Sequence, residues 1–434
     1  MRASLFAILL LICGSVFATP EIKHWETSNG ARVYYVHAPD LPMVDISVTF
    51  DAGGARDGNM PGVALMTNGM LPEGAGKLDA DAIAEQFESV GAQFSNTSLR
   101  DMSMLSLRTL TDKVWMDRAV DTFAMLINQP SFPKDAFERE RKRLQIALEQ
   151  KKQSPDALGE EAFFTQIYGK HPYAQPPSGT DDSVKAMRVS DLKAFYDRYY
   201  VGKNVVVAIV GAVDRQQAAA LADKVVGQLP AGKSAGDLPA VAELKKAKRE
   251  HIDFPSSQTH ILTGVVGISR DDPDYFPLYV GNHILGGSGL VSRISNEIRE
   301  KRGLAYSSYS YFLPMRAQGP FIMGLQTRND QAEDALSVLH DTLAEYIKHG
   351  PSKDELIAAQ KNITGGFALR LDSNGKIVSN LANIGFYNMP LDYLDTFIGK
   401  VEAVTAEQIR DAFARRINPD ALVTVMVGAK AEKQ

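Results

Sequence analysis

The two halves of this 434-residue chain end in matching segments. Residues 189–211 (VSDLKAFYDRYYVGKNVVVAIVG) and 404–428 (VTAEQIRDAFARRINPDALVTVMVG) each contain a Ser or Thr cap, an amphipathic helix, an Asn-containing turn and a Val-rich strand. Any helix–turn–strand unit shares part of this pattern, but here the order agrees throughout. The sequence therefore predicts an α+β fold of two duplicated domains. Each would be a mixed or antiparallel β-sheet with helices packed on it, forming a clamshell half.

Residues 229–245 (LPAGKSAGDLPAVAELK) are rich in Pro, Gly and Ala and show little periodicity, which predicts a linker between domains at 19–228 and 246–434. Hydrophobic periodicity predicts strands at 32–38, 44–51, 93–98, 103–110, 205–211, 248–254, 259–267, 304–313, 319–327 and 422–428. It predicts helices at 62–71, 79–90, 112–127, 134–152, 157–167, 190–200, 214–228, 273–285, 292–302, 330–348 and 353–371, with further helices to about 416. Strands 32–38 and 44–51 are expected to pair.

The first 18 residues have the pattern of a secretory signal peptide. The apolar run 5–12 is too short to span a bilayer, and the small residues Val16 and Ala18 fit a cleavage site. Cys13, the only cysteine, would be removed with this segment, so the mature chain would have no disulfide and no thiolate. We expect export to a bacterial periplasm.

Charge and hydropathy exclude two classes of partner. The net charge is −5 and no basic tract stands out, which argues against nucleic acid and against anionic membrane surfaces. No run after the first 18 residues approaches the length of a membrane span.

No local motif supplies catalytic chemistry. None of the eight histidines forms H-x-H, an i, i+4 pair or H-E-x-x-H, so no metal site is predicted. The segment GGSGL (286–290) differs from the nucleophile elbow G-x-S-x-G because Leu290 replaces the last glycine. EGAGKL (73–78) lacks the earlier glycine and the hydroxyl residue of a phosphate loop.

The stretch from Gly286 to Phe312 predicts a glycine turn, a helix and a strand. The expected features are a cap at Ser292, an apolar stripe at Ile294 and Ile298, a helix end at Gly303, and one strand face with Leu304, Tyr306, Ser308, Ser310 and Phe312. Arg299 then lies in the last helical turn and Tyr306 near the start of the strand. A guanidinium and a phenol held by rigid elements could hold a peptide and stabilise an oxyanion. They could equally be a cation favoured by the helix end and a half-buried strand aromatic.

Five features in order resemble the pitrilysin-like zinc peptidases, the inverzincins, and within them the two-subunit branch that includes mitochondrial processing peptidase. They are GGARDG…PGVALM, the helix ERERKRL followed by Pro155, the loop GKHPYAQPPSGT, the stretch LGGSGLVSRISNEIREKRGLAYS and the twin Val-Gly endings. Together they cover almost the whole mature chain.

This resemblance implies a degenerate zinc site in the first half. Family members carry H-x-x-E-H on the first long helix, and here Leu65, Asn68 and Gly69 occupy the His, Glu and His positions. The third ligand of the family, a Glu on a later helix, matches Ala147, and Glu140 matches an accessory carboxylate. Leu, Gly and Ala cannot ligate zinc, and Asn is no general base. We expect no metal and no cofactor in this chain, and zinc in a partner subunit.

The second half keeps the matching residues of the family. By resemblance, Arg299 and Tyr306 project into the zinc site of the other domain or subunit, where the phenol steadies the oxyanion and the guanidinium helps hold the substrate backbone. Gly286, Gly287 and Gly289 take the place of a longer glycine-rich loop in the non-catalytic processing-peptidase subunit. They are either substrate-binding residues or only a tight turn.

The sequence therefore predicts a non-catalytic subunit of a heteromeric periplasmic zinc metallopeptidase. A homologous subunit with H-x-x-E-H would be its heterodimer partner, and unfolded peptides would be bound between them. No self-sufficient activity is expected. One alternative is a stand-alone peptide-binding or holdase-like protein with no proteolytic role, and another is a hydrolase that uses unrecognised residues.

Overall fold

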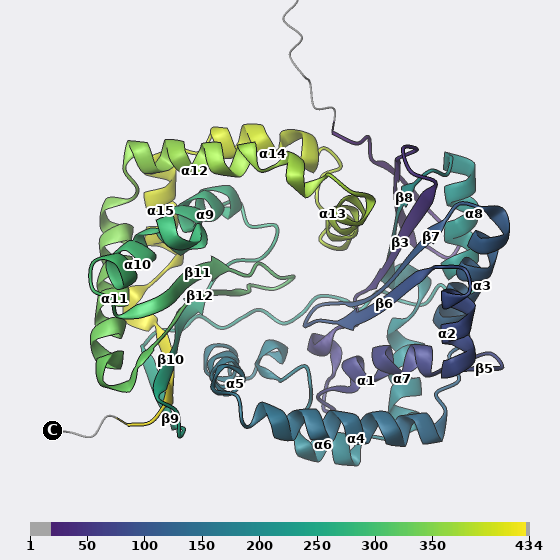
Figure 1. Cartoon of the computed structure of the whole chain (residues 1–434), viewed down its shortest axis with the longest axis horizontal. Helices are drawn as coiled ribbons and strands as arrows, with labels where there is room; N and C mark the ends of the chain where they lie inside the picture. The colour runs from purple at the N-terminus through teal and green to yellow at the C-terminus, as the bar shows by residue number, and fades with distance from the viewer. Residues whose placement is uncertain (1–18, 431–434) are drawn as a thin grey trace, which may run out of the picture.

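The computed structural model describes residues 19–430, and the predicted signal peptide 1–18 with Cys13 lies outside them. Within the described residues, a six-stranded sheet from the first half of the chain and a five-stranded sheet from the second stand at opposite ends of the molecule (Figure 1). No helix in this range combines the length and the apolar character that crossing a membrane requires. The predicted α+β fold class is confirmed.

The first sheet has the order β1-β2-β8-β3-β7-β6. Its strands are β1 (Lys23–Glu26), β2 (Arg32–His37), β3 (Met43–Phe50), β6 (Gln93–Ser98), β7 (Ser103–Leu110) and β8 (Val205–Gly211), and a separate ribbon pairs β4 (Gly74–Ala75) with β5 (Leu78–Asp79). The helices are α1 (Val63–Met70), α2 (Ala80–Glu88), α3 (Lys113–Asn128), α4 (Lys134–Lys151), α5 (Pro155–Tyr168), α6 (Asp181–Ala186), α7 (Val189–Tyr199) and α8 (Arg215–Val226). The expected pairing of strands 32–38 and 44–51, which are β2 and β3, is wrong. Strand β8 lies between them, parallel to β2 and antiparallel to β3.

The second sheet repeats this topology with the order β11-β12-β10-β13-β9. Its strands are β9 (Lys248–Asp253), β10 (Gln258–Val266), β11 (Ala305–Phe312), β12 (Pro320–Arg328) and β13 (Val423–Gly428). The helices are α9 (Tyr275–Asn282), α10 (Arg293–Ser295), α11 (Ala332–His349), α12 (Lys353–Gly365), α13 (Asn374–Phe386), α14 (Tyr393–Glu402) and α15 (Ala406–Arg416). β13 lies between β9 and β10, parallel to the first and antiparallel to the second, as β8 does between β2 and β3. The predicted duplication is confirmed.

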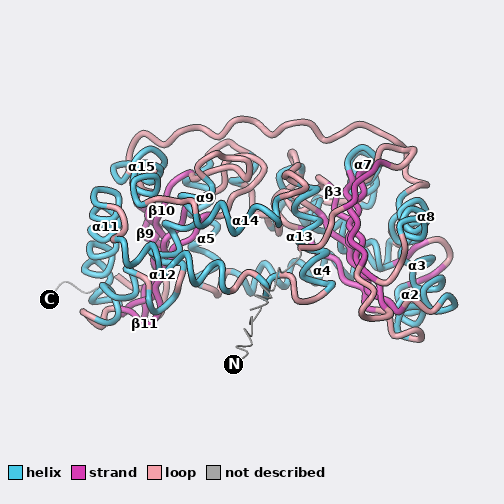
Figure 2. Tube along the Cα trace, turned by 90° about the horizontal axis from the view of Figure 1, so that it is seen from above, coloured by secondary structure: helices cyan, strands magenta, loops and turns pink. Residues whose placement is uncertain are grey.

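A long loop without helix or strand joins α8 to β9 over residues 227–247. Figure 2 shows this connection running along one face, from the first sheet to the second. The domain boundaries at 228 and 246 stay a prediction, because helices α5 and α13 pack across them onto the sheet of the opposite half.

Each half contributes one helix to the sheet of the other half. Helix α5 covers the second sheet, and the residues that meet there are Phe163, Phe164, Ile167, Val423, Val425 and Val427. Helix α13 covers the first sheet, where Tyr34, Val206, Ala208, Val210, Val378 and Leu381 meet. Figure 1 shows both helices on the inner sides of the two sheets. Because both faces of each sheet are covered, β8 and β13 are buried along their whole length, which explains their Val-rich sequences.

Polar contacts join the two halves beside these helices. Asp101, which is 4% exposed, accepts hydrogen bonds from the Tyr173 hydroxyl at 2.5 Å and from the Arg316 backbone N–H at 2.7 Å. Arg32 donates to the Gly385 carbonyl oxygen at 2.9 Å. These bonds bring together the β6–β7 turn, the loop before α6, the β11–β12 hairpin and the end of α13.

The segment that carries Arg299 follows the sequence prediction in part. Ser292 caps α10 by accepting from the Ser295 N–H, Ile294 and Ile298 are fully buried, and Gly303 ends the helical segment at φ 60°. The α-helix changes to a π-helical turn, η7, at Asn296–Glu300. The predicted strand face is wrong at Tyr306: Ser308 and Ser310 share a buried face, but a bulge between Ala305 and Ser308 leaves Tyr306 and Ser307 exposed.

An ion pair anchors this segment to α12. Arg293 donates from Nε and Nη2 to the two carboxylate oxygens of Glu355, each at 2.6 Å, and its guanidinium lies 4.9 Å from the Tyr346 ring centroid. Burial raises the pKa of Glu355, but the hydrogen bonds from Arg293 and Ser352 outweigh it and lower this pKa to about 2. The pair therefore stabilises the fold through the ionised carboxylate.

The contact between α13 and the first sheet requires a glycine. A Cβ at Gly385 would lie 2.5 Å from a Val206 methyl and 2.6 Å from the Tyr34 ring. We expect Gly385→Ala to lower the free energy of unfolding by about 1–3 kcal/mol through overpacking, measured by urea denaturation. Gly399→Ala is the matched control, because a Cβ there meets nothing within 4 Å. It should stabilise α14 by up to about 1 kcal/mol. Equal effects of the two substitutions would contradict the proposed packing.

The Arg293–Glu355 pair predicts a pH-dependent stability. The pKa of Glu355 is lower in the folded chain than in the unfolded chain, so the contribution is present above about pH 4.5 and is lost as the pH falls towards 2. We expect Glu355→Gln to lower the free energy of unfolding at pH 7 by about 1–2 kcal/mol, allowing for solvent screening of a partly exposed pair. The difference from wild type should shrink below pH 4.5 in urea titrations. Asp330→Asn, at an exposed pair, is the control and should leave this profile unchanged.

Candidate functional site

The positions that match the zinc ligands of the pitrilysin-like peptidases come together in the structure. Leu65 and Gly69 on α1 and Ala147 on α4 line one shallow pocket of about 260 Å³, together with Glu140, Arg143, Leu144 and Met66. The two helices bring these positions to one place although about 80 residues separate them in the sequence.

The walls of this pocket do not fit a zinc ion. Leu65, Gly69 and Ala147 offer no side-chain lone pair. The carboxylate of Glu140 accepts from Arg143 Nη1 at 2.8 and 3.0 Å, so its charge is already compensated. Across residues 19–430, no three His, Cys, Asp or Glu side chains are grouped so that they could hold a metal ion. The pocket can accept an apolar side chain, but it cannot activate water through a metal.

Asn68, at the position of the catalytic Glu, does not line this pocket. It is 2% exposed and faces the strands, where its amide nitrogen donates to the Met104 carbonyl oxygen at 3.4 Å. Asn96 on β6 donates to both the side-chain oxygen and the carbonyl oxygen of Asn68, at 3.0 and 2.8 Å. The residue therefore ties α1 to the edge strand of the first sheet.

A buried carboxylate that the sequence did not reveal supports α1. Asp57 accepts from the backbone N–H groups of Gly62 at 2.7 Å and Ala64 at 2.9 Å, and so caps the helix from outside it. Burial raises the pKa of Asp57 to about 7, against the two N–H bonds that favour the charged form. The GGARDG segment thus has a structural role in positioning α1.

The structure places Arg299 and Tyr306 side by side. The Arg299 guanidinium lies 4.6 Å from the centroid of the Tyr306 ring, a cation–π arrangement. Tyr306 is 83% exposed, and the nearest carboxylate contact of Arg299 is its neighbour Glu300, at 3.6 Å. Figure 1 shows α10, which leads into this segment, on the opposite side of the molecule from α1. Because Tyr306 is exposed, the pair is presented at the surface of the second half.

The three glycines of the predicted turn have distinct roles. A Cβ at Gly286 would lie 2.3 Å from Ser310 Oγ, so this glycine lets the π-helical turn η5 (His283–Gly287) pack closely on β11. A Cβ at Gly287 would lie 2.9 Å from Asn282 Nδ2, at the end of α9. Gly289 adopts φ +64° and is the residue that needs a left-handed turn. All three line a pocket of about 710 Å³ beside β11, together with Arg270 and Arg370.

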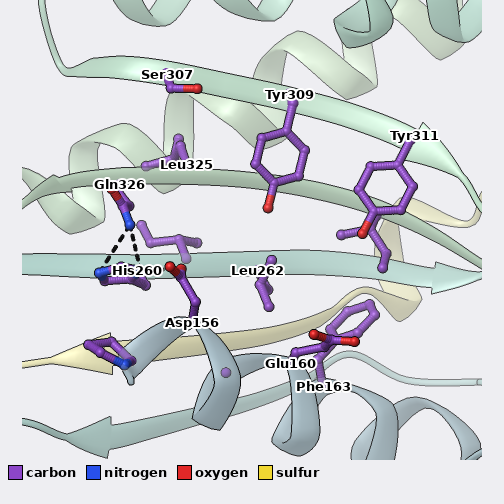
Figure 3. A pocket seen from close by; sticks show the side chains of 14 residues that line it. Asp156, Glu160, Phe163, His260, Leu262, Ser307, Tyr309, Tyr311, Leu325 and Gln326 are labelled. Atoms are coloured by element: carbon purple, nitrogen blue, oxygen red, sulfur yellow. Dashed lines mark hydrogen bonds and ion pairs between the residues drawn. The ribbon is translucent and has the colours of Figure 1, made fainter. Parts of the chain in front are cut away.

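A second pocket beside β11, of about 340 Å³, lies between α5 and the second sheet (Figure 3). Asp156 contacts His260 Nδ1, and Gln326 Nε2 lies 2.8 Å from the same nitrogen. Glu160, Ser307, Tyr309 and Tyr311 are its other polar lining residues. Burial raises the pKa of Tyr311 to about 12, so its hydroxyl stays protonated. No sequence motif indicated this pocket, because α5 and β10 are distant in the sequence and meet only because α5 packs on the sheet of the opposite half.

Comparison with known proteins gives matches across most of the chain. Residues 32–181 match the family model described as insulinase (peptidase family M16), and residues 186–363 match the model described as the peptidase M16 inactive domain. An uncharacterized zinc protease of Mycobacterium leprae is 27% identical over 94% of this chain and 91% of its own length. The non-peptidase homologue YmxG of Helicobacter pylori is 26% identical over 95% of both chains.

A solved structure gives a stronger match. The crystal structure of a peptidase M16 inactive domain from Pseudomonas fluorescens is 41% identical, with a TM-score of 0.92, over 95% of this chain and 99% of that chain. The structure of a Helicobacter pylori protease, 19% identical with a TM-score of 0.86, shares the fold. From these matches and the two family models, the chain belongs to peptidase family M16.

Proposed function

We propose that this chain is the non-catalytic subunit of a heteromeric periplasmic zinc metallopeptidase. It supplies Arg299 and Tyr306 to the active site of a homologous partner and helps to enclose peptide substrates. The observation that carries the proposal is an asymmetry between the two halves. Leu65, Gly69 and Ala147 leave the three ligand positions without a donor atom, whereas Arg299 and Tyr306 are stacked and Tyr306 is exposed.

The first half supports a non-catalytic role. A divalent ion needs several donor atoms at about 2.0–2.3 Å, and the converging side chains of Leu65 and Ala147 provide none. The chemistry of cleavage must then come from a chain that carries an intact H-x-x-E-H, and zinc belongs to that chain. The name of the Helicobacter pylori relative, a non-peptidase homologue, agrees with this assignment.

The second half supports a role in a neighbour's site. The Arg293–Glu355 ion pair, the buried Ile294 and Ile298 and the end at Gly303 hold the segment before Tyr306 in one geometry. A phenol on such a support can donate to a developing oxyanion without reorganisation, and a guanidinium can bind a peptide carbonyl or carboxylate through two donors. A tyrosine that is 83% exposed can enter another chain's cavity without first leaving a buried position.

The periplasmic location and the partner are the further parts of this proposal. The pattern of residues 1–18 supports export. The partner is expected to be an exported chain of similar length with H-x-x-E-H, and it should co-purify with this one from the periplasm.

Reconstitution with that partner tests the proposal. We expect the mixture to cleave an unstructured peptide while each chain alone has little activity. Tyr306→Phe should lower kcat by about 100-fold, the effect of removing one oxyanion donor. Arg299→Ala should mainly raise KM, because the guanidinium holds the substrate backbone. Steady-state kinetics on the purified complex measure both effects.

The matched control is Arg302→Ala, at an exposed arginine in the same turn that pairs with Glu297. It should leave kcat and KM unchanged, and gel filtration should show the same complex for all variants. A partner that cleaves equally fast alone contradicts the proposal. If the lone chain also binds unfolded peptides tightly and the partner adds nothing, the stand-alone peptide-binding function takes its place.

A further inference from the structure

The 710 Å³ pocket beside β11 contains two guanidinium groups that have no carboxylate partner within the described residues. We call it the arginine pocket and define it by Arg270, Tyr275, Tyr279, His283, Ser308 and Arg370. It lies between α9, η5 and β11. In the repeated topology, the edge strand β11 corresponds to the edge strand β6 of the first half, beside which α1 lies.

Arg270 is half-buried, and its polar neighbours are tyrosines. It donates from Nη1 to the Tyr275 hydroxyl at 2.7 Å and from Nη2 to the Tyr393 hydroxyl at 3.4 Å, and its Cζ lies 4.5 Å from the Tyr275 ring centroid. Across residues 19–430, no Asp or Glu oxygen lies within 4.0 Å of its guanidinium nitrogens. Phenol oxygens accept these hydrogen bonds but do not neutralise the charge, and a cation removed from water without a counter-ion is costly.

Arg370 adds a second positive charge at the rim. It donates from Nη2 to the Tyr279 hydroxyl at 2.7 Å, and the described part of the chain offers it no ion pair either. Burial, and after it the charge of Arg370, lowers the pKa of His283 in the same pocket. The lining therefore has a positive electrostatic potential that no carboxylate of the described residues balances.

Ser308 provides an unused hydroxyl in this lining. The residue is 8% exposed, and its Oγ has no hydrogen-bond partner among the described residues. The neighbouring Ser310 differs, because its hydroxyl donates to Asn282 Oδ1 at 2.7 Å and its carbonyl oxygen accepts from Asn282 Nδ2 at 3.0 Å. A buried polar group without a partner beside two unpaired cations indicates a missing acceptor.

We propose that the arginine pocket binds a carboxylate group, presented by the C-terminus or an acidic side chain of a peptide that lies beside β11. A guanidinium forms its strongest hydrogen bonds with carboxylates, in which two N–H groups face two oxygens. The cavity is far larger than one carboxylate, so the rest of it can hold neighbouring residues of a peptide. The peptide source of the carboxylate rests on the proposed function, whereas the anion site does not require a partner subunit.

Binding to the lone mature chain tests this inference. The probes are a short acetylated Gly-Ser peptide with a free C-terminal carboxylate, the same peptide as its amide, the amide with one internal Glu, and succinate. Isothermal titration at low ionic strength should show binding of the two carboxylate-bearing peptides, with the neutral amide at least about tenfold weaker. If succinate binds as tightly as the peptides and competes with them, the carboxylate site stands and its source is a free small anion.

Arginine variants locate the site. Arg270→Gln and Arg370→Gln should each weaken binding of the carboxylate peptides about tenfold or more. Arg328→Gln removes the same charge from an exposed arginine outside the pocket, paired with Asp330, and should change binding less than about twofold. Arg370 lies at the rim, so Arg370→Gln should keep the wild-type melting temperature and separates loss of binding from loss of folding.

Two results would overturn the inference. The first is equal binding of the free-acid and amide peptides, or no binding of any probe. The second is equal weakening by Arg370→Gln and Arg328→Gln, which would indicate a general charge effect. Because no partner subunit is present, these results leave the reconstitution experiment unaffected, and a failed reconstitution leaves the carboxylate site intact.

Discussion

The structure depends on the exchange of α5 and α13 between the two halves. Each sheet has one face covered by helices of its own half and the other face covered by a helix from the opposite half. Separating the halves would expose the apolar face of β8 that α13 covers and the valine face of β13 that α5 covers, so the sheets keep fixed positions at the two ends of the molecule. Close approaches at Gly385 and the Asp101 hydrogen bonds add geometric specificity to this apolar contact.

Because the two halves hold fixed positions, the difference between the zinc-ligand positions of the first half and the Arg299–Tyr306 pair of the second has a functional consequence. The pocket on α1 and α4, in the first half, has no zinc donor at the three ligand positions, whereas the second half presents the stacked Arg299 and Tyr306. On the proposed function, the pair acts on the site of a second chain, and the first half of this chain contributes enclosure rather than chemistry. The arginine pocket would add a fixed point for an acidic group of the same peptides.

Local sequence signals predicted the local structure well. The cap at Ser292, the left-handed Gly303 and the twin α7–β8 and α15–β13 units depend on neighbouring residues, so the sequence was sufficient. The family resemblance placed Leu65, Gly69 and Ala147 at positions that converge in one pocket.

Other features depend on contacts between distant segments. Hydrophobic periodicity cannot tell which sheet α5 or α13 will cover, that β8 enters between β2 and β3, or that a bulge displaces Tyr306. The arginine pocket was missed because Arg270 and Arg370 are 100 residues apart and form no motif.

Metal analysis of the lone chain tests the central claim most directly. The mature protein would be purified without a polyhistidine tag, equilibrated with zinc, dialysed against a weak chelator and analysed by mass spectrometry of the metal content. The account predicts far less than one zinc ion per chain, because Leu65, Gly69 and Ala147 carry no donors and the one carboxylate beside them, Glu140, is paired with Arg143. One tightly held zinc ion per chain would contradict it.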